Sequence, residues 1–114
     1  GLVDLDKPAN SYLGEGVLRA VAGKAEDITP RRLLNHTAGF ARCYSLYYAP
    51  ATPGPLQGFL AHYGQAVMAP GSAFEYSNLG YAAAGAVLAK AAEVPMIRVA
   101  SSCFMRISGP WFLG

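Results

Sequence analysis

The chain has 114 residues and a formal net charge of +2, a size that allows one domain or part of one. Hydrophobic residues make up 53% of it and can fill a core, but the 14% charged content is low for a free-standing domain and indicates surfaces covered by further chain. The scattered Lys and Arg residues form no basic stripe, which argues against nucleic-acid binding.

The two cysteines give no sign of a metal site. Cys43 and Cys103 lack the spacing of metal ligands, and no histidine motif accompanies them. Two free thiols and one disulfide are both compatible with the sequence. We therefore predict no metal and no other cofactor.

The first 27 residues predict short, weak elements. Apolar and acidic residues alternate over residues 3–6, and Pro8 suits the first position of a helix. A single helical turn is therefore expected over residues 8–13. The apolar residues between positions 17 and 21 suggest a second weak helix, which Gly23 would end before a charged loop.

Residues 30–37 predict the first well-marked helix. Thr29 can cap it with its side-chain oxygen, and Pro30 suits the first helical position because an N–H there would be unpaired in any case. Leu33–Leu34 supply an apolar face, and Gly39 is placed to end the helix.

His36 lies in the last turn of this predicted helix. One interpretation is a general base, because histidine titrates nearest to neutral pH. The interpretation that we favour is a structural histidine, hydrogen-bonded within the turn.

An aromatic loop and an amphipathic helix follow. The loop over residues 41–54 contains three tyrosines and is either a wall of a substrate site or a covering of the core. From Pro55 to Gly64, apolar residues recur at i, i+3, i+4 and i+7. This spacing predicts a helix with one apolar face, with His62 turned toward solvent.

The stretch over residues 70–92 organises the rest of the chain. Pro70-Gly71 is a turn signal, and residues 74–77 alternate apolar and polar side chains in a short extended segment. Residues 79–89 are all apolar or glycine. They predict a buried helix over 78–92, which is too short to span a membrane.

The start of that helix presents Tyr76, Ser77 and Asn78 beside an apolar interior. On their own, Ser77 and Asn78 are more typical of a helix N-cap than of a catalytic pair, and Tyr76 is compatible with a half-buried loop residue. Polar groups held rigidly at such a helix start are also well suited to catalysis. The surrounding residues decide between these interpretations.

Three segments resemble motifs of one family. Residues 70–81, Pro-Gly-Ser-Ala-Phe-Glu-Tyr-Ser-Asn-Leu-Gly-Tyr, resemble the second catalytic motif of the serine β-lactamase and penicillin-binding-protein superfamily. The likeness is closest to class C β-lactamases and the related esterases and D-amino-acid peptidases. Residues 28–40 are similar to the family's Ile-Thr-(…)-Leu-Leu-(…)-His-Thr-Ser-Gly segment, with Ala38 in place of the serine. Residues 1–8 are similar to its Gly-x-Leu-x-Leu-Asp-x-Pro segment.

This resemblance implies a fold and a chemistry. The chain would be a mainly α fragment, the helical subdomain of the β-lactamase/transpeptidase-like α/β (α+β) fold without its flanking strands. The family's reaction is acyl transfer through a serine ester, in which Tyr76 would be the general base and acid. Asn78 would bridge the lysine of a Ser-x-x-Lys motif and the substrate. His36 would shape the floor of the site and would not be its base.

The family's catalytic set is incomplete in this chain. No serine is followed three residues later by lysine, and no Lys-Thr-Gly or His-x-Gly motif is present. We therefore expect the helical middle of a serine hydrolase, inactive on its own. The alternative is a non-catalytic product, either a degenerate remnant or a helical binding module on the same scaffold.

Residues 96–114 depart from the family pattern, since neither helical nor alternating spacing fits them. We expect residues 1–95 to be a partial β-lactamase-related domain and the remainder a divergent tail. One hypothesis is a reading-frame slip near Pro95, because a neighbouring frame would restore a family-like Pro-Tyr-Asp start. Sequencing of the codons around Pro95 tests this hypothesis.

The resemblance also limits the partners of the full-length parent. Its substrate would be a small molecule or peptide: a β-lactam, a D-amino-acid peptide or an ester. An exported parent, periplasmic or secreted, would fit the family. The chain itself carries no signal peptide, but it begins with Gly1 rather than Met, so this absence says nothing about the parent.

Overall fold

The computed structural model describes residues 1–42 and 56–93. The predictions on the aromatic loop, the two cysteines and the divergent tail lie outside the described residues. In chain order the elements are α1 (Asn10–Leu13), β1 (Arg19–Ala20), η1 (Ala25–Asp27), α2 (Pro30–Leu34), α3 (Leu56–Tyr63), β2 (Gln65–Ala66) and α4 (Asn78–Ala91). No helix in these two ranges has the length and apolar character needed to cross a bilayer.

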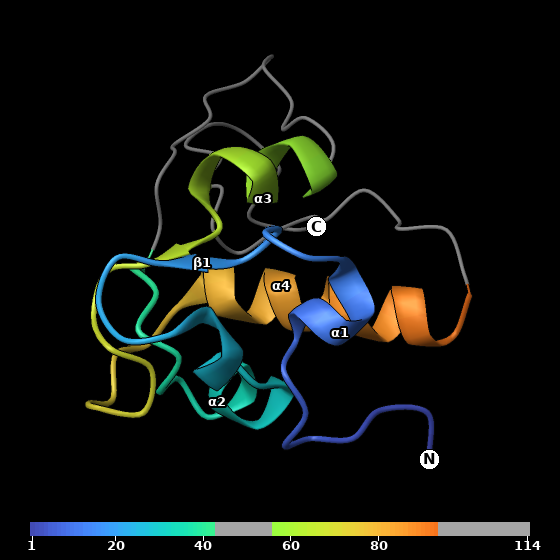
Figure 1. Cartoon of the computed structure of the whole chain (residues 1–114), viewed down its shortest axis with the longest axis horizontal. Coiled ribbons are helices and arrows are strands. Elements are labelled where there is room, and N and C mark those ends of the chain that lie inside the picture. The colour runs from blue at the N-terminus through green and yellow to red at the C-terminus, as the bar shows by residue number, and fades with distance from the viewer. Residues whose placement is uncertain (43–55, 94–114) are drawn as a thin grey trace, which may run out of the picture.

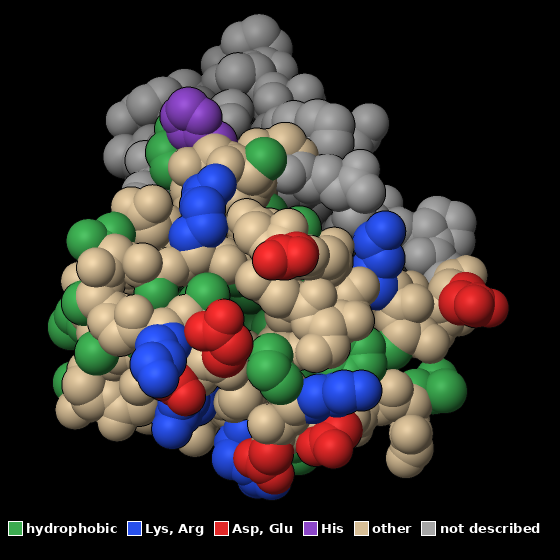
Figure 2. All heavy atoms as spheres, viewed as in Figure 1, with side chains coloured by type: hydrophobic (Ala, Val, Ile, Leu, Met, Phe, Trp, Pro, Cys, Tyr) green, Lys and Arg blue, Asp and Glu red, His purple; other side chains and the backbone are tan. Residues whose placement is uncertain are grey.

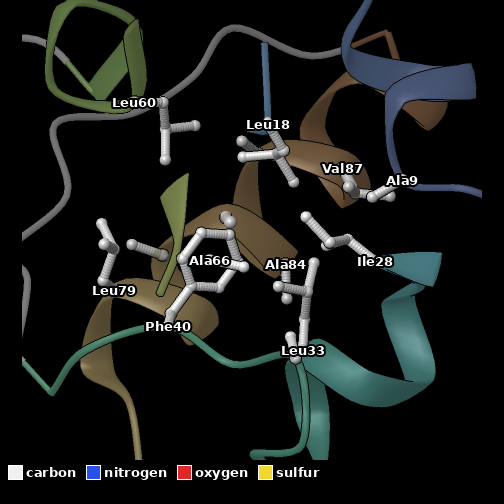
Figure 3. Close-up of a cluster of buried hydrophobic side chains, with 14 residues drawn as sticks. Ala9, Leu18, Ile28, Leu33, Phe40, Leu60, Ala66, Leu79, Ala84 and Val87 are labelled. Atoms are coloured by element: carbon white, nitrogen blue, oxygen red, sulfur yellow. The ribbon is translucent and has the colours of Figure 1, made fainter. Parts of the chain in front are cut away.

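Helix α4 lies at the centre of the fold. It runs lengthwise behind the other elements, with α2 below it and β1 and α3 above it in the view of Figure 1. It contacts α1, α2 and α3. Buried side chains from all these parts converge on it, among them Leu18, Leu33, Phe40 and Leu60 (Figure 3). The core is therefore organised around the helix that follows Tyr76.

The predicted burial of α4 is confirmed on one face and wrong on the other. Its inner face consists of buried and mostly small residues, namely Leu79, Ala82, Ala83, Ala84, Ala86 and Val87. Apolar residues and glycine also occupy the outer face, which explains the poor amphipathic pattern of the helix. Tyr81 and Leu88, however, are 50% and 57% exposed, and Gly85 lies between them on the same outer stripe. The Tyr81 ring meets the His36 ring, so the stripe is covered in part at that end of the helix.

Helix α2 begins as predicted and ends early. Thr29 Oγ1 accepts the Arg32 N–H (3.3 Å), and Pro30 occupies the first turn. The helix stops at Leu34 because His36 adopts a left-handed backbone with φ +64°, so Gly39 is not its terminator. Only one residue of the predicted apolar face, Leu33, is buried.

The weak helix predicted around residues 17–21 is wrong, because this segment forms β1. The Asn10 side chain pairs with the Leu18 backbone, donating to its carbonyl (2.8 Å) and accepting its N–H (2.9 Å). These bonds hold the segment extended, and β1 then pairs in parallel with β2, Arg19 opposite Gln65. The sheet joins the N-terminal half of the chain to the segment that follows α3. The short helix predicted over 8–13 is present as α1.

Helix α3 ends as predicted, with its apolar face inward. Leu60 is buried and His62 is exposed. The Gly64 N–H closes the last turn on the Leu60 carbonyl (2.8 Å). Arg19 reaches over from β1 and donates to the Ala61 carbonyl (2.7 Å), a favourable place for a cation because helix carbonyls are unpaired there. The predicted start at Pro55 lies outside the described residues.

Candidate active site

Ser77 is the N-cap of α4 and is only 3% exposed. Its hydroxyl accepts the Gly80 N–H (2.8 Å) and donates to the Ala41 carbonyl (2.7 Å). One side chain thus satisfies a free helix N–H and a carbonyl of a distant segment. Ser77 therefore has the structural role of a cap, and the residues on either side of it, Tyr76 and Asn78, are held at a fixed helix start.

Four further hydrogen bonds tie residues 36–42 to residues 71–78, and we call this set, together with the Ser77–Ala41 bond, the clamp. Its backbone members run from Gly71 N–H to the Thr37 carbonyl (2.7 Å), from Glu75 N–H to the His36 carbonyl (2.8 Å) and from Asn78 N–H to the Arg42 carbonyl (3.1 Å). Its side-chain member runs from Ser77 N–H to His36 Nδ1 (3.1 Å). The two motif segments seen in the sequence are therefore one structural unit.

Gly39 connects the clamp to the segment that follows β2. Its φ is +87°, and its carbonyl accepts the N–H groups of Val67 (2.8 Å) and Met68 (3.2 Å). A Cβ on Gly39 would overlap the Met68 carbonyl oxygen. The glycine of the His-Thr-Ala-Gly turn is thus required by a close backbone crossing as well as by its own backbone angle.

Tyr76 lies at the surface of the clamp and is 43% exposed. Its ring packs on His36 with the ring centroids 4.6 Å apart, and the Arg42 guanidinium carbon lies 5.2 Å from its centroid. A phenol in this position is reachable from solvent, while its ring is held from behind by an imidazole and approached by a cation. Asn78 is the first residue of α4 and is partly buried. The predicted pair is thus brought to one helix start, and its catalytic roles remain a prediction.

His36 makes contacts that the sequence did not reveal. Its ring stacks on Tyr81 (4.9 Å between centroids, 12° between planes) and meets Phe74 edge-on (5.7 Å, 85°). Because Nδ1 accepts the Ser77 N–H, the proton of the neutral ring is on Nε2. The favoured interpretation of a structural histidine agrees with this bond, although the partner is Ser77 and not a group within the turn.

Two residues next to Tyr76 were missed by sequence reasoning. Arg42 follows the recognised motif and carries no pattern of its own, so nothing in the sequence pointed to it. Tyr81 lies five residues after Tyr76 in the second motif and was assigned only to the helix. The signal available for Tyr81 was its position one turn into α4, facing back toward the helix start.

One surface hollow of the described chain lies away from Tyr76 and Asn78. This hollow of about 310 Å³ is lined by residues of the N-terminal segment and η1, among them Glu15 and Glu26, and includes neither Tyr76 nor Asn78. Across residues 1–42 and 56–93, no three His, Cys, Asp or Glu side chains come together in a way that could hold a metal ion.

Comparison with known proteins identifies the family. The model of the Beta-lactamase family matches residues 1–102. The chain belongs to this family. The resemblance drawn from three sequence motifs is therefore confirmed, and the chain is part of a serine hydrolase superfamily that includes penicillin-binding proteins.

Two solved structures show the same fold. A D-stereospecific amidohydrolase from Streptomyces sp. is 26% identical, with a TM-score of 0.64, and the match covers 84% of this chain and 32% of that one. A D-amino acid amidase from Ochrobactrum anthropi SV3, solved with D-phenylalanine, is 25% identical with a TM-score of 0.59, covering 82% and 25% of the respective chains. No curated protein gives a significant match. The chain thus spans about a third or a quarter of these enzymes, and its fold is β-lactamase-like and partly helical.

Proposed function

We propose that this chain is the helical segment of a serine hydrolase that works through an acyl-enzyme. The observation that carries the proposal is the helix start of α4, where the clamp fixes the backbone around Tyr76 and Asn78. The cap at Ser77 is nearly fully buried, whereas Tyr76 is half exposed. This arrangement fixes the backbone firmly and leaves the phenol open to a substrate, as a preorganised catalytic group requires.

In the complete enzyme, Tyr76 takes the proton of the nucleophilic serine and passes it to the leaving group. The Arg42 guanidinium carbon lies 5.2 Å from the centre of the phenol ring, so a cation stands beside the group that would carry the proton. Asn78 holds the lysine of the Ser-x-x-Lys motif through its amide oxygen and donates its amide N–H to the substrate. Both the serine and the lysine come from chain outside this sequence.

We propose amides or peptides of D-amino acids as the substrate class, ahead of β-lactams and simple esters. The support is the pair of structural relatives, named as a D-stereospecific amidohydrolase and a D-amino acid amidase. The chain on its own is expected to hydrolyse none of these, because no serine in it has a lysine one helical turn later to activate it.

The second candidate is a non-catalytic remnant or binding module on the same scaffold. The observation that favours it is the departure of residues 96–114 from the family pattern. The full-length gene distinguishes the two. A Ser-x-x-Lys within roughly 30 residues before Gly1, about one long helix and a loop, supports the hydrolase, and its absence supports the remnant.

Substitution of Tyr76 in the full-length protein tests the catalytic role directly. Tyr76→Phe keeps the ring on His36 and removes only the hydroxyl, so kcat should fall by about 10² to 10⁴. Tyr81→Phe is the matched control, because it removes a hydroxyl from another ring stacked on the same histidine. Steady-state hydrolysis of a D-amino-acid amide measures both. Equal kcat in the Tyr76→Phe variant and the wild type would refute the role.

Asn78→Ala tests the bridging role with a different signature. The loss of a group that touches both lysine and substrate should lower kcat and raise KM together. The Asn78 backbone bond to Arg42 remains in this variant, so the clamp stays closed. A change in the melting temperature without any change in kcat or KM would contradict the bridging role.

A further inference from the structure

His36 connects the clamp to the aromatic side chains around Tyr76. Its carbonyl accepts the Glu75 N–H (2.8 Å), and its Nδ1 accepts the Ser77 N–H (3.1 Å). The two amides on either side of Tyr76 are therefore both bonded to this one residue. The phenol ring of Tyr76 also packs against the imidazole, at 4.6 Å between centroids.

We propose that His36 is a positioning residue for Tyr76, holding its backbone from both sides and its ring from behind. This inference rests on the proposed function of Tyr76 and adds a group that acts through it. His36 is not the base itself, because the free lone pair of its neutral ring is on Nδ1 and already accepts the Ser77 N–H. Misplacement of a catalytic group by about 1 Å can cost about a hundredfold in rate, so removal of this support should lower kcat.

The backbone of His36 decides which variants isolate its side chain. Its φ of +64° is left-handed, a conformation that is strained for most residues and is tolerated by Gly and Asn. His36→Gly therefore removes the ring and Nδ1 without backbone strain. His36→Asn retains an acceptor, since Asn Oδ1 is bonded to Cγ as His Nδ1 is, and it loses only the ring.

The kinetic test uses both variants in the full-length protein. His36→Gly should lower kcat about 10- to 100-fold and leave KM within about twofold. His36→Asn should recover kcat to within about fivefold of wild type, because the bond to Ser77 sets the backbone. His62→Asn is the matched control, since this second histidine is exposed on α3, and its kcat should equal that of wild type.

Separate outcomes overturn the inference and the proposed function. If Tyr76→Phe abolishes turnover while His36→Gly changes only the melting temperature, His36 is merely structural and the inference is wrong. If His36→Asn recovers no activity relative to His36→Gly, the acceptor does not position Tyr76 and the inference is again wrong. If Tyr76→Phe is fully active, the proposed role of Tyr76 fails instead.

A measurement independent of catalysis tests the same hydrogen bond. The chain contains only two histidines, so ¹⁵N-histidine labelling gives one imidazole signal set for each. His36 should show a protonated Nε2 and an unprotonated Nδ1, with a slowly exchanging Ser77 amide. The slow exchange should be lost in His36→Gly and kept in His36→Asn. A protonated Nδ1 in neutral His36 would overturn the assignment, even if a variant failed to fold.

Discussion

The clamp and the Asp6–Arg31 ion pair both join segments that lie far apart in the sequence, but they differ in surroundings. The clamp consists of hydrogen bonds around the buried Ser77. The ion pair is bidentate, with N–O distances of 2.7 and 2.9 Å, yet the two side chains are 54% and 69% exposed. Figure 2 shows Lys and Arg interspersed with Asp and Glu over the lower part of this face.

The difference shows that burial, more than bond length or charge, decides how much such a connection contributes to the free energy of unfolding. The Arg31 side chain lowers the pKa of the Asp6 carboxyl, chiefly by hydrogen bonding to it. Water and salt compete for both partners at the surface, and exposed pairs contribute little. Ser77, by contrast, is shielded from water, so the loss of a partner of its hydroxyl leaves a buried polar group unsatisfied.

Gly39→Ala should give the largest loss of stability, because it disturbs the close backbone crossing between Gly39 and Met68 that supports the clamp. The added Cβ meets the Met68 carbonyl, and φ is +87°. We expect a loss of about 3–5 kcal/mol, the sum of steric overlap and backbone strain. Gly16→Ala is the matched control, since φ there is +75° and no heavy atom lies within 4 Å of the added Cβ.

Urea denaturation followed by circular dichroism measures both glycine variants. Gly16→Ala should cost only about 1–2 kcal/mol, the strain alone. Equal losses in the two variants would show that the crossing at Met68 contributes nothing.

Ser77→Ala should have an intermediate effect. It removes the cap of α4 and leaves the Ala41 carbonyl without its hydroxyl donor, so we expect a loss of about 1–3 kcal/mol. Ser72→Ala is the control, because its hydroxyl makes one exposed local bond to Ala69 (2.6 Å). If the urea midpoints of Ser77→Ala and Ser72→Ala are equal, the hydroxyl of Ser77 does not stabilise the start of α4.

Asp6→Asn should have the smallest effect. The pKa of Asp6 is lowered in the folded state, so its contribution is present above the ordinary value of 3.8 and is lost as the pH falls through the lowered value. The melting temperatures of wild type and variant should therefore converge in acid and in high salt. A double-mutant cycle with Arg31→Gln isolates the pair. A coupling that persists unchanged in high salt would mean that the pair is less accessible to water than its exposure indicates.

The parts of the fold that were predicted correctly are those with a local cause. Thr29 and Ser77 bond to N–H groups three residues later, so the starts of α2 and α4 follow from short stretches of sequence. The same holds for the end of α3 at Gly64. The catalytic roles of Tyr76 and Asn78 were inferred from the resemblance to a known family, since the residues alone favoured a plain cap, and these roles stay a prediction.

The parts that were missed depend on distant partners. β1 is extended because Gln65 and Ala66 lie beside it, and two-residue strands carry no periodicity to detect. His36 ends α2 early in a conformation stabilised by bonds to Glu75 and Ser77, which no local pattern encodes. The exposed outer stripe of α4 was missed for a related reason: composition predicts an apolar helix but does not say which neighbours cover it.

The clamp also has a consequence for the order in which the molecule assembles. Its members at His36 and Ser77 are 41 residues apart, and those at Ala41 and Ser77 are 36 apart. Contacts of such long range form late, because the entropy of closing the loop must be overcome before they stabilise anything. Helices α2 and α4 can therefore form before Tyr76 reaches its final place. In native-state hydrogen exchange, the Ser77 amide would then report on the completion of the site, while amides in the middle of α4 report on the helix alone.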